Sequence, residues 1–194
     1  MLHNQNYNDI SFKKKEKKII FPARVLLDKG IKEFVQAANI LKPVFPDWQF
    51  IVAGAFDYKN PSSISLEQIQ KIVSKNSVVF LGHLSHIEDL FKTSSIVCLP
   101  SYREGMPKAL LEAQAAGCAV VTTDVIGCRE SILDKQTGFL VKPNFLSFFN
   151  CLNEILNSDD CYNEIVLNAR EKAISLFHKE NNLKMNLDLI NDVF

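Results

Sequence analysis

The stretch "SIVCLPSYREGMPKALLEAQAAGCAVVTTD", residues 95–124, contains the pattern that decides the fold. Residues 95–101 form a mainly apolar run with the length of a buried strand. An alanine-rich segment with helical spacing follows, and residues 118–124, "CAVVTTD", predict a second strand. Two strands joined through a helix by short connections predict a parallel β–α–β unit.

The same alternation of strand and helix extends in both directions along the chain. Apolar residues recur at helical spacing in a predicted helix over 28–42, at Ile31, Phe34, Val35, Ala38 and Leu41. Further strands are predicted at 18–25, 48–54, 77–82 and 138–143, further helices at 65–75 and 87–94, and a helical tail from 145 with breaks near 157–160 and 177–181. This order predicts an α/β fold, a Rossmann-like parallel sheet with helices on both faces. In such sheets ligands bind at the carboxyl ends of the strands.

The composition is that of an ordinary soluble globular domain, with 47% hydrophobic and 23% charged residues. Lys+Arg and Asp+Glu number 22 each, so no net charge points to a nucleic acid as partner. The five cysteines include no C-x-x-C pair, which favours a reduced, cytoplasmic protein and argues against a zinc site. No apolar run has the length of a membrane span, and the N-terminus lacks the apolar core of a signal peptide.

The first 18 residues are polar and end in the run "KKKEKK", Lys13 to Lys18. Charge runs of this kind are usually solvated, so one interpretation is a leader or linker over 1–18, ahead of a domain that spans 19–194. The alternative is a basic patch that attracts the anionic lipid headgroups of the cytoplasmic leaflet.

The residues that follow the strand 95–101 form the first candidate site. Glu104 and Gly105 lie in the connection, Pro107 suits a first helical turn because it has no N–H to leave unpaired, and Glu112 lies one to two turns further on. A helix that opens at the end of a strand presents free N–H groups and a positive dipole end, which favour a diphosphate. We therefore predict that Glu104 and Glu112 address different parts of one ligand. The alternative for Glu112 is a solvated glutamate without a binding role.

A second candidate lies at the first strand-to-helix turn, "ARVLLDKG", which carries Arg24 and Lys29. Two cations near the end of a neighbouring strand can neutralise a leaving diphosphate without a metal ion. The alternative is that Lys29 and Asp28 only decorate the start of a helix.

Two other connections also carry polar residues. Gly82 and His83 follow a strand in "FLGHLS", residues 80–85, where the histidine either touches a ligand or is a bystander. In the segment 122–131 we expect Gly127 to permit a turn and Glu130 to start a short helix. The patterns H-x-x-x-H, G-x-S-x-G, the P-loop and G-x-G-x-x-G are all missing, so the site types that depend on them are not indicated.

Taken together, these segments resemble the C-terminal half of the family-4 glycosyltransferases, enzymes of the two-domain GT-B architecture. The resemblance covers residues 19–143 and is carried by "ARVLLDKGIKEF", "FIVAG", "VVFLGHL", "SIVCLPSYREGMPKALLEAQAAGCAVVTTDVIGCRES" and "TGFLVKP". The motif set is specific: two glutamates with seven residues between them, an alanine-rich helix, a V-V-x-T-D strand and a G-x-x-E turn.

The resemblance implies a role for each matched residue. Arg24 and Lys29 match the pair that holds the donor's diphosphate, and Glu104 matches the glutamate that faces the donor sugar's hydroxyls, so these three are the expected catalytic residues. Glu112 matches the glutamate that binds the ribose hydroxyls. The other expected donor-binding residues, at the helix start and in a base-contacting segment, are Gly105, Met106, Pro107, Lys108, Gly82, His83 and Leu84. No metal and no cofactor is expected.

The sequence departs from the family pattern in two respects. Ala23 stands where the family usually has a glycine before the arginine, which narrows the approach to the backbone. The chain also has no counterpart of the N-terminal, acceptor-binding domain, so we expect a donor-binding half that is inactive without an N-terminal half on another chain.

The function that the resemblance implies is transfer of a sugar, with retention, from a nucleotide-sugar to a glycan or lipid-linked acceptor. The segments "SYREGMPKALLEA" and "NPSSIS" are similar to members that use UDP-sugars in bacterial surface polysaccharide synthesis. We expect a cytoplasmic protein with peripheral contact to the inner membrane face. The alternatives are a non-catalytic nucleotide-sugar-binding protein or remnant of a split glycosyltransferase, and an unrelated nucleotide-binding α/β module, which the missing glycine fingerprint disfavours.

Overall fold

The computed structural model describes residues 15–74, 76–158 and 163–177. Its strands form one six-stranded sheet in which all neighbouring strands run parallel. The strands are β1 (Glu16–Phe21), β2 (Gln49–Val52), β3 (Val79–Phe80), β4 (Ser94–Leu99), β5 (Ala119–Thr123) and β6 (Phe139–Val141). The predicted parallel, Rossmann-like sheet is therefore confirmed.

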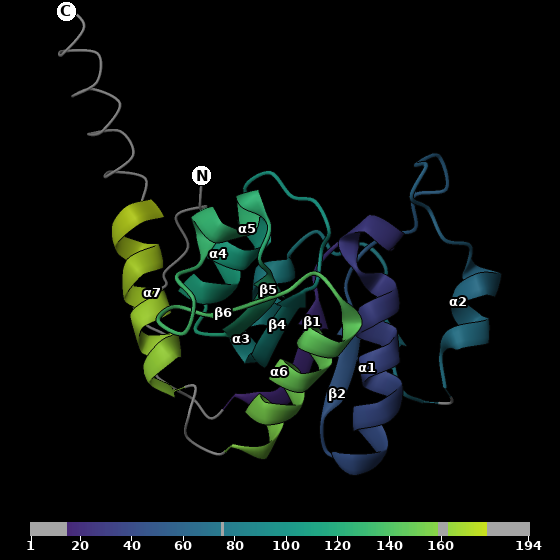
Figure 1. The fold of residues 1–194 in the computed structure, drawn as a ribbon, viewed down its shortest axis with the longest axis horizontal. Helices are drawn as coiled ribbons and strands as arrows, with labels where there is room; N and C mark the ends of the chain where they lie inside the picture. Colours follow the sequence, from purple (N-terminus) through teal and green to yellow (C-terminus); the bar gives the residue numbers. More distant parts are fainter. Residues whose placement is uncertain (1–14, 75, 159–162, 178–194) are drawn as a thin grey trace, which may run out of the picture.

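Helices cover both faces of this sheet, as predicted. They are the 3₁₀ turn η2 (Leu27–Lys29) and the α-helices α1 (Ile31–Val44), α2 (Leu66–Ile72), α3 (Ile87–Thr93), α4 (Lys108–Ala115), α5 (Ile126–Ser131), α6 (Phe145–Asn157) and α7 (Asn163–Phe177). Figure 1 shows α1 and α6 side by side on one side of the sheet and α4 on the other, with α7 packed against α4.

The order of the strands across the sheet is β3-β2-β1-β4-β5-β6. From β1 the chain adds β2 and β3 on one side of the sheet. It then returns to place β4 on the other side of β1, and β5 and β6 follow on that side. The register pairs Ile20 of β1 with Val97 of β4, so the segments that leave these two strands start at the same edge of the sheet. Ligands of open α/β sheets bind at such a reversal of strand order.

The core lies between the sheet and its helical layers. All six residues of β4 are buried, as expected for a central strand covered on both faces. The apolar positions predicted for α1 are buried as well, so its inward face is confirmed. Phe34 of α1 packs between Phe21 and Phe50, with ring centroids 5.4 and 6.0 Å apart, which holds α1 on β1 and β2.

Several helix boundaries differ from the prediction. The helix expected over 28–42 is divided at Gly30 into η2 and α1. Pro107 lies just before α4 and not within its first turn, and Glu130 lies near the end of α5, whose start is Ile126. The break predicted near 157–160 is confirmed, because α6 ends at Asn157 and α7 begins at Asn163. The second predicted break begins at the end of α7 and otherwise lies outside the described residues.

The lysine-rich run is in part a strand. β1 begins at Glu16, inside the segment expected to be a solvated leader. Lys15 donates hydrogen bonds to the carbonyl oxygens of Phe91, at 2.9 Å, and Ala116, at 2.7 Å, near the ends of α3 and α4. Burial lowers the pKa of this ammonium group. The solvated interpretation is therefore wrong for Lys15, whereas Glu16 and Lys17 are exposed although they belong to β1; residues 1–14 lie outside the described part of the chain.

Candidate functional site

The connection between β4 and α4, residues 100–107, is called here the β4–α4 loop. It is fastened to the connection that follows β1: the hydroxyl of Ser101 and the N–H of Tyr102 both donate to the carbonyl of Asp28, at 2.9 and 2.8 Å. The hydroxyl of Thr123, at the end of β5, donates to the carbonyl of Ser101. Three strand ends thus share one hydrogen-bonded unit at the carboxyl edge of the sheet.

Gly30 allows α1 to begin against the end of β4. It has a left-handed backbone, with φ of 79°, and a Cβ at this position would lie 2.1 Å from the carbonyl oxygen of Pro100. Both its conformation and its contact therefore require a glycine. The close approach brings Lys29, which precedes Gly30, to the β4–α4 loop.

The result is an ion pair between two of the predicted catalytic residues. Lys29 Nζ lies 2.8 Å from Glu104 Oε1, and the two side chains are only 18% and 11% exposed. Lys29 also donates to the carbonyl of Arg103 at 3.2 Å. Because both charges are largely removed from water, this pair is more strongly coupled than an ordinary surface salt bridge.

Arg24, the third predicted catalytic residue, has a different partner. Its Nη1 lies 2.5 Å from Oδ2 of Asp57, which follows β2, and its side chain is 54% exposed. The two predicted cations therefore each face a carboxylate from a separate connection. The prediction missed Asp57, although an acidic residue shortly after a strand in "VAGAFD" was a usable signal.

Tyr102 and Glu33 form a second link between the β4–α4 loop and α1. The phenol of Tyr102 donates to Glu33 Oε1 at 2.7 Å. Desolvation, followed by the hydrogen bond and charge of Glu33, raises the pKa of Tyr102 to about 12. The sequence gives no sign of this pairing, because Glu33 and Tyr102 lie 69 residues apart on separate connections.

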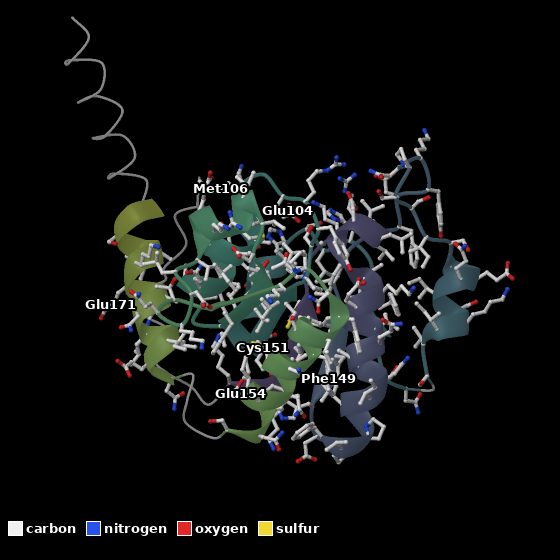
Figure 2. The ribbon with its side chains drawn as sticks, viewed as in Figure 1. Glu104, Met106, Phe149, Cys151, Glu154 and Glu171 are labelled. Atoms are coloured by element: carbon white, nitrogen blue, oxygen red, sulfur yellow. The ribbon has the colours of Figure 1, made fainter. Side chains whose placement is uncertain are left out.

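The start of α4 carries the residues expected to meet phosphates. Gly105, Met106 and Lys108 are exposed, whereas Pro107 is buried. A Cβ added to Gly105 would meet nothing within 4 Å, so the backbone is open to approach here. The first N–H groups of a helix have no partner within the helix and attract anions. Figure 2 shows Glu104 and Met106 at the same end of the molecule.

Glu112 lies half-buried within α4, in the second turn of the helix that starts at Lys108. On the neighbouring α5, a Cβ added to Gly127 would lie 1.4 Å from the carbonyl oxygen of Gly105. The backbone of α5 therefore packs directly against the β4–α4 loop. The sequence predicted only a turn at Gly127 and not this contact.

The strand order reverses between β1 and β4, and this place is called here the switch point. The expected base-contacting residues lie on the opposite side of the switch point from the β4–α4 loop. Gly82, His83 and Leu84 follow β3, which is separated from β4 by β2 and β1. Gly82 has a left-handed φ of 70°, His83 is exposed and Leu84 is half-buried. Among the described residues, no hydrogen bond or ion pair joins these three to the β4–α4 loop, so their participation in one site depends on a ligand that spans both.

The described residues contain neither a cluster of metal-binding side chains nor a helix that could span a membrane. No group of three or more His, Cys, Asp or Glu side chains there is placed to hold a metal ion. Within the same ranges, no helix has both the length and the apolar character needed to cross a membrane.

Comparison with known proteins gives the family. The sequence profile described as "Glycosyl transferases group 1" matches residues 4–172. The chain is 34% identical, over 157 residues, to the N,N'-diacetylbacillosaminyl-diphospho-undecaprenol alpha-1,3-N-acetylgalactosaminyltransferase of Campylobacter jejuni, covering 80% of this chain and 40% of that protein. The chain thus spans less than half the length of this curated relative, and the same holds for the Staphylococcus aureus capsular polysaccharide glycosyltransferase CapM, of which 42% is covered.

Solved structures share the fold. Anabaena Alr3699/HepE in complex with UDP superposes with a TM-score of 0.78 at 21% identity, over 92% of this chain and 49% of that one. The C-terminal domain of a group 1 glycosyl transferase, LpcC, from Francisella tularensis matches with a TM-score of 0.71 at 23% identity, over 89% of this chain and 92% of that one. With the profile match over most of its length and this fold, the chain belongs to the group 1 glycosyl transferases.

Proposed function

We propose that this domain binds the nucleotide-sugar donor of a retaining glycosyltransferase. The observation that carries the proposal is the Lys29–Glu104 ion pair, held at the carboxyl edge of the sheet beside the start of α4. A cation, a carboxylate and free helix N–H groups gathered at the switch point provide charge complementary to a diphosphate and acceptors for sugar hydroxyls.

Each residue then has a distinct role. When the bond between the sugar's anomeric carbon and the diphosphate breaks, negative charge develops on the departing oxygen. Lys29, Arg24 and the N-terminus of α4 stabilise that charge without requiring a metal ion. Glu104 accepts hydrogen bonds from the sugar's hydroxyls and keeps Lys29 in place. Glu112 binds the ribose hydroxyls, and the segment Gly82 to Leu84 contacts the base.

UDP is the favoured nucleotide. The named ligand of the Anabaena structure is UDP, and an Escherichia coli relative, 28% identical, is named for transfer from UDP-Gal to a diphosphoundecaprenol-linked sugar. The Campylobacter relative is likewise named for a diphospho-undecaprenol acceptor. These names support a lipid-linked acceptor in bacterial polysaccharide synthesis. As part of the same proposal, the protein acts at the cytoplasmic face of the membrane, and an N-terminal half supplies the acceptor site.

Calorimetric titration of the 194-residue chain with UDP, GDP, ADP and uridine tests donor binding. We expect saturable binding of UDP, and a loss of about tenfold or more in Arg24→Ala or Lys29→Ala, because each removes a charge-assisted hydrogen bond to phosphate. Uridine binding should change little. Lys17→Ala is the matched control. Lys17 forms an ion pair with Asp47, with 3.3 Å between Nζ and Oδ2, and this pair does not lie at the carboxyl edge of the sheet. If the chain binds none of these nucleotides, the proposal is wrong.

A transfer assay separates the enzyme from a non-catalytic binding protein. Catalysis requires both reactants in near-attack geometry, and positioning supplies roughly 7–11 kcal/mol of the barrier. We expect negligible transfer by this chain and transfer with retained anomeric configuration once an N-terminal half is supplied. Donor binding with no transfer under either condition would favour the non-catalytic alternative.

A further inference from the structure

The connections that follow β1 and β2 are joined by their backbones. The N–H of Val25 donates to the carbonyl of Ala55 at 2.9 Å, and the N–H of Leu27 donates to the carbonyl of Ser62 at 2.8 Å. Val25 also forms an isolated parallel bridge with Phe56. Arg24 and Asp57 are sequence neighbours of the two bridged residues, so main-chain contacts bring their two connections together independently of the ion pair.

The residues on either side of Asp57 are held by aromatic packing. Phe56 stacks on Phe80 of β3, with ring centroids 6.3 Å apart and an interplanar angle of 22°. Tyr58 stacks on the same Phe56 ring at 5.7 Å and 12°. A loop fixed by both backbone bonds and stacked rings presents its carboxylate at little further entropic cost.

The resulting ion pair leaves most of the guanidinium free to bind something else. Only Nη1 of Arg24 contacts Asp57, at 2.5 Å, whereas a guanidinium carries five N–H donors in a planar fork. The Arg24 side chain is 54% exposed and that of Asp57 29% exposed. The carboxylate thus restrains a long side chain without covering it.

We propose that Asp57 is a positioning residue: it holds the Arg24 guanidinium ready to bind the diphosphate of the donor. This inference rests on the proposed function and extends it to a residue outside the expected set. A free arginine loses much rotamer freedom when it binds an anion, and a restraining carboxylate removes part of that loss in advance. The opposite effect, competition between Asp57 and phosphate for Arg24, predicts the opposite sign in the same measurement.

Titration of the full chain with UDP and with uridine tests the inference. Asp57→Ala should weaken UDP binding by roughly 3- to 10-fold, the range of a coupled neighbour that does not itself touch the ligand. Asp57→Asn keeps an oxygen acceptor at the same place and should recover part of the loss. Uridine affinity should stay unchanged in both variants. In an Arg24→Ala background, Asp57→Ala should cost nothing more.

Asp47→Ala provides the matched control, since Asp47 also pairs with a cation, Lys17, away from this edge. Tighter UDP binding by Asp57→Ala would overturn the inference in favour of competition. An equal loss in the Arg24→Ala background, or an equal loss for uridine, would also overturn it, because Asp57 would then act through the loop. Wild-type binding of UDP with no effect of Asp57→Ala refutes this inference alone, whereas a wild-type chain that binds no nucleoside diphosphate refutes the proposed function with it.

Discussion

Lys29 and Glu104 meet at 2.8 Å although they belong to different strand–helix connections, one after β1 and one after β4. Their contact depends on the strand order, which sets β1 beside β4, and on Gly30, which lets α1 begin against Pro100. The ion pair therefore depends on both the topology of the sheet and the local packing at its carboxyl edge.

The Lys29–Glu104 pair should contribute to stability as well as to binding. Lys29→Ala leaves a carboxylate that is only 11% exposed without this partner, and should lower the free energy of unfolding by about 1–3 kcal/mol. The double variant Lys29→Ala/Glu104→Gln removes both charges and should be more stable than the summed losses of Lys29→Ala and Glu104→Gln predict. Urea unfolding at pH 7 measures the free energy of unfolding of each variant. If the loss in the double variant equals the sum of the losses in the two single variants, the side chains are not coupled.

Gly127 and Gly105 should respond differently to an added methyl group. Gly127→Ala places a Cβ 1.4 Å from the carbonyl oxygen of Gly105, so α5 and the β4–α4 loop must move apart, at a cost of about 1–3 kcal/mol. Gly105→Ala meets nothing within 4 Å and should fold normally, while obstructing a ligand that approaches the backbone. Thermal unfolding and UDP titration together check the contrast. Equal stability of the two variants would show that the contact at Gly127 is not restrictive.

Tyr102 should make stability depend on pH in the alkaline range. Its pKa is raised from 10.0 to about 12 in the folded protein, so the folded state keeps a proton that the unfolded state loses. The stabilisation is complete below about pH 10 and is lost as the pH rises towards 12. Compared with Tyr102→Phe, the wild type should lose stability more steeply across this interval. If the stability of the two proteins depended on pH in the same way, the pKa of Tyr102 would not be raised in the folded state.

Glu112→Ala should weaken UDP binding and leave the fold intact. The loss of a hydrogen bond from ribose to a carboxylate corresponds to roughly 1.5–3 kcal/mol of binding free energy. Glu154→Ala, an exposed glutamate on α6, is the matched control. Calorimetry should show the loss with UDP and also with uridine, which carries the same ribose. An unchanged affinity in Glu112→Ala would reject the ribose assignment.

Lys15 should be more important for stability than Lys17, another residue of the lysine-rich run. Lys15→Ala removes hydrogen bonds to the carbonyls of Phe91 and Ala116 and should cost about 1–3 kcal/mol. Lys17→Ala removes an exposed ion pair and should cost about 1 kcal/mol or less. Chemical unfolding of the two variants compares them directly. Similar losses would mean that Lys15 is as solvated as a charge run usually is.

The sequence alone was sufficient for the sheet and its parallel direction. Apolar runs of strand length alternate with segments of helical period, and that local pattern depends only on which residues must leave water. The same reasoning placed Glu104 just after a strand, and Arg24 and Lys29 around the first strand-to-helix turn, because a parallel sheet brings its strand ends to one edge. The family resemblance then assigned their roles.

Only the tertiary structure decided which of these residues are partners. The pairs Lys29–Glu104, Arg24–Asp57 and Tyr102–Glu33 each join connections that are distant in the sequence. Side-chain pairing of this kind has no period and no fixed spacing, since it follows from strand order and from close backbone contacts such as that of Gly30 with Pro100. Lys15 shows the same principle: a lysine in a charged run is expected to be solvated, but carbonyl oxygens at the neighbouring ends of α3 and α4 accept its hydrogen bonds and leave it half-buried. Local composition determines which segments form strands and helices, whereas the environment of a charge depends on atoms brought to it by the rest of the fold.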